Sequence, residues 1–170
     1  MMVSMATTDW QAVLVELLNT TPVIDGVATD ELDDDAAARS WLRTRGGDGS
    51  EDLDDVRRVR ADLQRVVRGE LVPAVLGGYL DGVRQVPSID ADGLTWSLGG
   101  AVDWPARVVL AWGAMETNAP GRLRPCANDE CRLFLLDRTR AGTARWCSMS
   151  GCGNRMKARR HYDRQAGRSG

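Results

Sequence analysis

The segment CANDECRLFLLDRTRAGTARWCSMSGC, residues 126–152, holds every cysteine of the 170-residue chain. Cys126 and Cys131 form one C-x4-C pair, and Cys147 and Cys152 form a second pair after fifteen intervening residues. Zinc favours four thiolates in a tetrahedron, and each close pair can turn a loop so that both sulfurs reach one ion. The spacing therefore predicts one structural zinc ion per chain, held by these four residues.

Two other uses of four cysteines remain open. Disulfides would suit the same pairs, but the first residues lack the basic start and long apolar run of a secretory signal, so we expect a cytoplasmic protein with reduced thiols. Iron–sulfur ligation also takes four cysteines, although paired spacing matches zinc better. A catalytic zinc is disfavoured, because four thiolates leave no coordination position for water or substrate.

The segment around the cysteines has few large apolar residues, so we expect metal binding to supply its folding free energy. Residues 132–136 and 143–147 are predicted to pair as a hairpin, and a helix is predicted to begin near Asn154. Together with the cysteine knuckles these elements are similar to a treble-clef finger. Trp146 is expected to pack against the metal site rather than to stack on a base.

Charge divides the chain into an acidic and a basic part. Residues 1–121 hold 10 Lys and Arg against 20 Asp and Glu, whereas residues 122–170 hold 12 against 4. This asymmetry suggests two units with different partners, and the basic unit points to a polyanion such as DNA. The alternative is that the basic part docks on the acidic part. We expect domains 1–121 and 122–170, joined through a linker at residues 117–125 that contains two prolines and a glycine.

The basic part carries the candidate nucleic-acid contacts. A helix from Asn154 would present a cationic face suited to phosphates, and arginines between the cysteine pairs would extend it. Asn154 could equally cap that helix, and His161 is expected to be an exposed helix residue, because four cysteines complete the zinc shell. Arg155, Lys157 and Arg159 are the candidates for base contacts. The full predicted set is Arg138, Arg140, Arg145, Asn154, Arg155, Lys157, Arg159, Arg160, His161 and Arg164.

The acidic part is predicted to be mainly helical. Apolar spacing and capping residues indicate helices in residues 10–18, 29–47, 50–69 and 71–83. Ser50 is placed to cap the third helix, and a further helix is expected from Asp103. Residues 86–100 alternate apolar and polar side chains around a turn at residues 90–93, which predicts a short β-hairpin. The predicted fold class is α+β, a helical N-terminal domain with a hairpin followed by a small four-cysteine finger.

Two sets of motifs make the chain similar to known protein families. Residues 126–164 closely resemble the CGNR zinc finger, with its paired C-x4-C knuckles, the W-C-S-M approach to the second pair, and the tetrapeptide CGNR at residues 152–155. The acidic part resembles the ABATE domain that usually precedes this finger. That resemblance rests on an L-x-N-T signature at residues 17–20 and on a D-x-L followed by W-L within residues 30–42.

The resemblance implies a bacterial transcription regulator that binds DNA through its finger, with the preceding domain a sensor of stress or of a small molecule. An RNA-binding or protein-interaction module built on the same finger is the alternative. We expect no enzyme, because no nucleophile, paired carboxylate, phosphate loop or open metal site stands out. No charge-free stretch exceeds about ten residues, so no membrane partner is expected. A homodimer would suit a symmetric DNA site.

Overall fold

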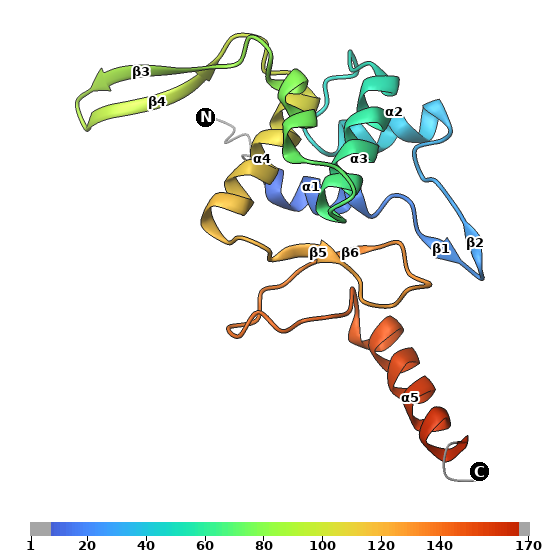
Figure 1. Ribbon diagram of the computed structural model, residues 1–170. Helices are drawn as coiled ribbons and strands as arrows, with labels where there is room; N and C mark the ends of the chain where they lie inside the picture. The colour runs from blue at the N-terminus through green and yellow to red at the C-terminus, as the bar shows by residue number, and fades with distance from the viewer. Residues whose placement is uncertain (1–7, 167–170) are drawn as a thin grey trace, which may run out of the picture.

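The computed structural model describes residues 8–166, with side chains as far as residue 162. Its body is a group of helices packed around one hydrophobic core (Figure 1). The helices of the body are α1 (Trp10–Leu18), α2 (Asp35–Arg43), α3 (Leu53–Val67), the 3-10 helix η1 (Pro73–Leu80) and α4 (Trp104–Asn118). Helix α3 contacts each of the other four, so it is the centre of the helical body.

Helix α3 forms because its apolar residues share one face. Leu53, Val56 and Leu63 recur at helical spacing, and all three are buried. Gly69 follows the helix with a φ of +76°, in the left-handed region that glycine adopts without strain and that commonly ends a helix. The prediction of a helix in residues 50–69 is confirmed.

The N-terminal cap of α3 differs from the predicted one. The Asp52 carboxylate accepts hydrogen bonds from the backbone N–H groups of Asp54 and Asp55 and is therefore the cap. The prediction of Ser50 was wrong, because the Ser50 hydroxyl donates to the Asp48 carboxylate in the preceding loop. The helix consequently begins at Leu53.

Residues 71–83, predicted as an α-helix, instead contain the 3-10 helix η1. Pro73 begins η1, and only Leu76 within it is buried. Gly77 and Gly78 lower the α-helical propensity of this stretch, and a single buried apolar side chain gives little packing energy to offset that. The short η1 nevertheless lies against both α3 and α4.

Within residues 8–166 the strands form three separate two-stranded antiparallel sheets. They are β1 (Val23–Ile24) with β2 (Val27–Ala28), β3 (Arg84–Asp90) with β4 (Gly93–Gly99), and β5 (Leu123–Pro125) with β6 (Phe134–Leu136). The β3–β4 pair is the hairpin predicted in residues 86–100. It projects away from the helical body (Figure 1).

The β5–β6 pair corrects the expected strand pairing. Leu123 pairs with Leu136 and Pro125 with Phe134, so residues 134–136 do not form a hairpin with residues 143–147. Short apolar runs do not identify their partners, and Leu123 and Phe134 gain burial in the hydrophobic core by pairing here. Part of the expected linker 117–125 is therefore the end of α4 and a strand.

The chain then passes through a single π-helical turn, η2 (Met149–Gly153), directly into α5 (Asn154–Ala166). The Ser148 side chain accepts a hydrogen bond from the Gly151 N–H group and caps η2. Asn154 has helical backbone angles, so the prediction that Asn154 could be the N-cap of the helix was wrong. The α+β fold class with a C-terminal four-cysteine cluster is confirmed. Within residues 8–166 no helix is both long and apolar enough to cross a membrane.

Candidate metal centre and nucleic-acid interface

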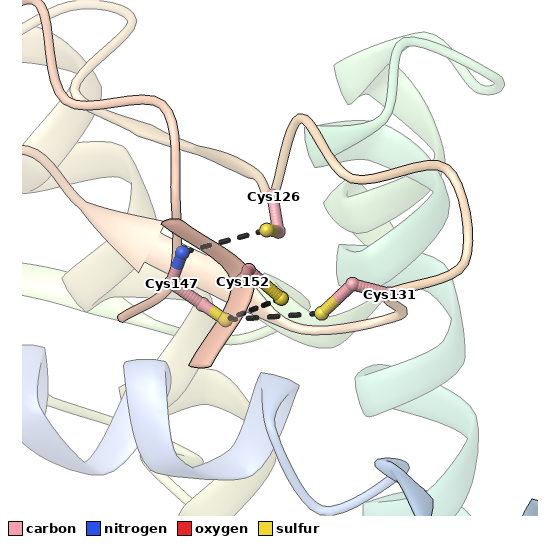
Figure 2. Close-up of side chains that lie close together, drawn as sticks. All are labelled: Cys126, Cys131, Cys147 and Cys152. Atoms are coloured by element: carbon pink, nitrogen blue, oxygen red, sulfur yellow. Dashed lines mark hydrogen bonds between the residues drawn. The ribbon is translucent and has the colours of Figure 1, made fainter. Parts of the chain in front are cut away.

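The four cysteines converge from three pieces of chain onto one point (Figure 2). Cys126 follows strand β5, Cys131 closes the same loop, Cys147 precedes η2, and Cys152 lies within η2. Their Sγ atoms all lie within 4.8 Å of one another. The Sγ atom of Cys147 is 3.8 Å from that of Cys131 and 3.7 Å from that of Cys152.

These separations fit one zinc ion. A Zn–S bond of about 2.3 Å places the sulfurs of a regular tetrahedron about 3.8 Å apart, which is close to two of the separations seen here. A disulfide requires sulfurs about 2.05 Å apart, and all four cysteines are free. The donor set is thus four soft thiolates, the set typical of a structural zinc site, and the cluster is consistent with one zinc ion.

Backbone and side-chain donors point at the sulfurs. The Cys147 N–H group lies 3.4 Å from the Sγ atom of Cys126, and the Asn128 side-chain amide donates to the Sγ atom of Cys152 at 3.4 Å. Asn128 is only 1% exposed, and its carbonyl oxygen accepts from the Glu130 N–H group. Such outer contacts orient metal ligands and favour the charged thiolate.

The thiols differ in acidity. Burial raises the pKa of Cys131 to about 11 and also raises the pKa of Cys147. Burial opposes ionisation of Cys152 too, but hydrogen bonds from Asn128 and the neighbouring thiols outweigh it and lower that pKa. Thiols buried in this way ionise together at neutral pH when a divalent cation stabilises the thiolates.

Gly153 of the CGNR tetrapeptide lies in a crowded position. A Cβ atom built there would lie 3.0 Å from the Met149 Sδ atom and 3.3 Å from the Trp146 ring. Trp146 is half-buried, and Arg145 lies over its ring at 5.2 Å. The predicted packing of Trp146 beside the metal site agrees with this contact.

Helix α5 begins two residues after Cys152, and its cationic side chains as far as residue 161 are exposed to solvent. Among the described residues no ion pair engages Arg155 or Lys157. Arg159 forms an exposed ion pair with Glu130 at 3.3 Å. The remaining predicted residues of the helix are exposed at Asn154, Arg160 and His161, whereas the side chain of Arg164 lies outside the described residues.

The predicted arginines between the cysteine pairs do not join α5 in one patch. Arg138, Arg140 and Arg145 are exposed on the loop after β6, and Figure 1 shows this loop extending to the other side of the finger from α5. Asp137 anchors the loop. Its fully buried carboxylate accepts from the Arg124 guanidinium at 2.5 Å.

Hydrogen bonds hold the pKa of Asp137 below its usual value. The Thr139 hydroxyl is the strongest donor, and the backbone N–H groups of Thr139 and Ala144 also contribute. The carboxylate therefore stays charged at neutral pH. It fixes both ends of the loop after β6, residues 138–145, which we call the arginine loop.

Two polar contacts join the motifs of the acidic part to the rest of the molecule. The Asn19 side chain hydrogen-bonds to the backbone of Phe134 in β6. Arg60, only 6% exposed, forms a two-point ion pair with Asp30 and donates to the Thr20 hydroxyl. The two motifs therefore meet at Arg60 of α3, and the L-x-N-T motif also contacts β6. Sequence spacing indicated neither contact.

Several of these residues escaped sequence reasoning. Asn128 lies between two predicted ligands, and a turn-forming Asn at that place was the available signal. Asp137 stood out only as a lone acid in a basic stretch. Asn19 and Arg60 reach partners 115 and 30 residues away, and the single sequence carries no signal for such contacts.

Comparison with protein families gives two matches. Residues 11–133 match the ABATE family, described as "Putative stress-induced transcription regulator". Residues 122–165 match the CGNR zinc finger. The two matches overlap at residues 122–133, which contain β5 and the first cysteine pair. No curated protein matches the chain.

Proposed function

The chain belongs to the ABATE family of transcription regulators and carries a CGNR zinc finger, and from this premise we propose that it binds duplex DNA through the finger. The observation that carries the proposal is the solvent-exposed cationic helix α5, which starts two residues after a cysteine of the metal centre. A cationic helix on a fixed base is suited to phosphate and groove contacts. In this proposal the finger comprises residues 122–170, and residues 1–121 form the sensing domain.

The zinc ion has a structural role in this proposal. Cys126, Cys131, Cys147 and Cys152 would hold it, and its binding would contribute on the order of 10 kcal/mol to the folding of the finger. Four protein ligands fill the coordination shell, so the ion supplies no catalytic water. The description of the family as a transcription regulator likewise supports a role without enzymatic activity. In this proposal the protein acts in the cytoplasm.

Within α5 we assign base contacts to Arg155, Lys157 and Arg159. Arg159 would exchange Glu130 for DNA at little cost, because exposed ion pairs contribute only about 0–1 kcal/mol. The other candidates would contact phosphates. Those in α5 are Asn154, Arg160, His161 and Arg164, and those on the loop after β6 are Arg138, Arg140 and Arg145. Because the loop lies apart from α5, it would contact a separate stretch of the DNA phosphate backbone.

The test is the affinity of the zinc-loaded full chain for random duplex DNA across a salt series. A plot of log affinity against log salt should be steep, and Arg160→Ser, at a proposed phosphate contact, should reduce its slope by about 0.9. Arg43→Ser removes an exposed arginine of α2 and is the matched control, with an unchanged slope. Absence of binding at low salt would overturn the proposal in favour of a protein partner, and preference for single-stranded RNA would favour RNA.

The sensing domain would respond to a small molecule or a stress signal. A cavity of about 430 Å³ lies between α1, α4 and the arginine loop, lined in part by Gln11, Met115, Arg122 and Arg138. Occupancy of this cavity could therefore alter the loop that carries proposed DNA contacts. Addition of a metabolite library should raise the melting temperature for the wild type more than for Gln11→Trp, which fills the cavity. Equal shifts for both proteins would exclude this site.

A further inference from the structure

The β3–β4 hairpin leaves both of its faces in solvent. It projects from the helical body (Figure 1), and Ile89 is 82% exposed, Leu94 61% and Trp96 59%. A two-stranded hairpin with no covering layer is at best marginally stable in water. Single apolar side chains scattered on a surface are normal, whereas exposed apolar side chains gathered in one patch mark an interaction site. The hairpin is therefore suited to contact a partner.

The register collects the apolar side chains on one face of the hairpin. Pro87 pairs with Trp96 and Ile89 with Leu94, so these four side chains lie on the same face, together with Leu98. No charged side chain belongs to this face, which we call the arm face. A partner for it must therefore be apolar and uncharged.

The opposite face of the hairpin is mainly polar, with Val86 as its exposed apolar side chain. Ser88 pairs with Thr95, and their hydroxyl oxygens lie 2.7 Å apart. This polar face provides matched control positions on the same two strands.

A groove of complementary character lies between η1 and α4. It has a volume of about 480 Å³, and none of its lining residues is charged. Leu76 and Leu80 contribute from η1, and Val109, Trp112 and Ala114 contribute from α4. The same chain thus presents one uncharged apolar projection and one uncharged apolar recess.

The hairpin does not cover the groove of its own chain. It leaves the body directly after η1 and returns directly before α4, and it extends away from both helices (Figure 1). At the base of the hairpin the two chain segments approach closely at Gly82 and Gly100, which both have positive φ. A Cβ atom at Gly100 would overlap the Gly82 carbonyl oxygen. Folding back into its own groove would require breaking this base.

We propose that the chain forms a two-fold homodimer in which the arm face of each copy lies in the η1–α4 groove of the other. Such an exchange is closed and reciprocal, as a two-fold interface requires. Within one copy the hairpin and α5 project at opposite ends of the molecule (Figure 1).

The arm is tested by sedimentation equilibrium of the zinc-loaded full chain. The wild type should be a dimer, and the double substitution Leu94→Asp with Trp96→Asp should raise the dissociation constant about a hundredfold, as loss of a buried aromatic anchor does. Thr95→Asp adds one such charge on the polar face of the same strand and should remain dimeric. A wild type that stays monomeric across the micromolar range would overturn the proposal.

The groove is tested by Ala114→Arg, which places a charged side chain on its exposed rim. This variant should be monomeric, whereas Asn118→Arg, on the same helix but outside the groove, should dimerise normally. Mixing the arm variant with the groove variant should restore a weaker heterodimer, because one intact arm still meets one intact groove. Dimers that survive Ala114→Arg but not the arm substitutions would show that arms stack on each other, which overturns the exchange.

Discussion

The Asn19 side chain pairs with both backbone groups of Phe134: its oxygen accepts from the Phe134 N–H group at 2.7 Å, and its amide donates to the Phe134 carbonyl oxygen at 3.2 Å. Asn19 follows α1, whereas Phe134 begins β6 between the two cysteine pairs. A side chain from the signature motif of the ABATE domain thus hydrogen-bonds to strand β6 of the finger as the backbone of a neighbouring strand would.

Asn19→Ala should therefore weaken the attachment of β6 to the helical body. Loss of both bonds leaves a partly buried backbone N–H group without its acceptor, at a cost of about 1–3 kcal/mol. Hydrogen exchange should accelerate at Phe134 and its neighbours while the amides of α3 stay protected. Asn118→Ala is the matched control, because the Asn118 amide bonds only to its own helix, at Ala114. Equal protection at Phe134 in wild type and Asn19→Ala would contradict this role.

The ion pair between Arg60 and Asp30 should contribute much more than the surface pairs of the same helix. Asp30→Asn leaves a nearly buried guanidinium without its charged partner, which should lower the free energy of unfolding by about 2–3 kcal/mol. Asp54→Asn removes one of the two exposed acidic partners of Arg57 and should cost under about 1 kcal/mol. Urea denaturation of both variants measures the difference, and similar midpoints would contradict the assignment.

The same pair predicts a pH dependence. Burial tends to raise the pKa of Asp30, but the hydrogen bond and charge of Arg60 outweigh it and lower that pKa below its ordinary value of 3.8. Protonation is then harder in the folded than in the unfolded state, so this contribution is complete above pH 3.8 and is lost as pH falls through the folded value. The stability difference between wild type and Asp30→Asn should be constant above that pH and shrink below it. Subtraction cancels the acid release of zinc, which both proteins share.

The metal centre predicts one zinc per chain by elemental analysis. Cys147→Ser should abolish stoichiometric zinc and unfold the chain around η2 and α5, because the site loses on the order of 10 kcal/mol of binding free energy. The helical body should remain folded, since its core is built from α1, α3 and α4 and retains Leu123 and Phe134. Ser148→Ala, beside the ligand but outside the cluster, should keep the zinc. Stoichiometric iron, or full zinc in Cys147→Ser, would contradict the assignment.

What the sequence revealed depended on how local the signal was. The cysteine spacing identified the metal centre because two short loops bring each pair together, and apolar spacing with caps located α1, α3, α4 and the β3–β4 hairpin. The partner of β6 was mispredicted because Phe134 finds its burial against α1 and β5, far away in the chain. The alternation of apolar and polar residues does not show whether another element covers the apolar face of a hairpin. The exposure of Trp96 could therefore be seen only in the structure.

Gly153 supplies the last prediction, because its side-chain hydrogen faces the Met149 thioether and the Trp146 ring. Gly153→Ala requires these neighbours to shift slightly, and because the Met149 side chain is exposed and flexible the cost should be up to about 1 kcal/mol, the low end of the range for overpacking. Gly113→Ala in α4 meets nothing within 4 Å and should instead stabilise the chain by about 0.5–1 kcal/mol through helix propensity. Chelator competition should also show weaker zinc retention for Gly153→Ala alone, since the residue adjoins Cys152. If both alanines raised the melting temperature, the close packing around the CGNR turn would not constrain the metal centre.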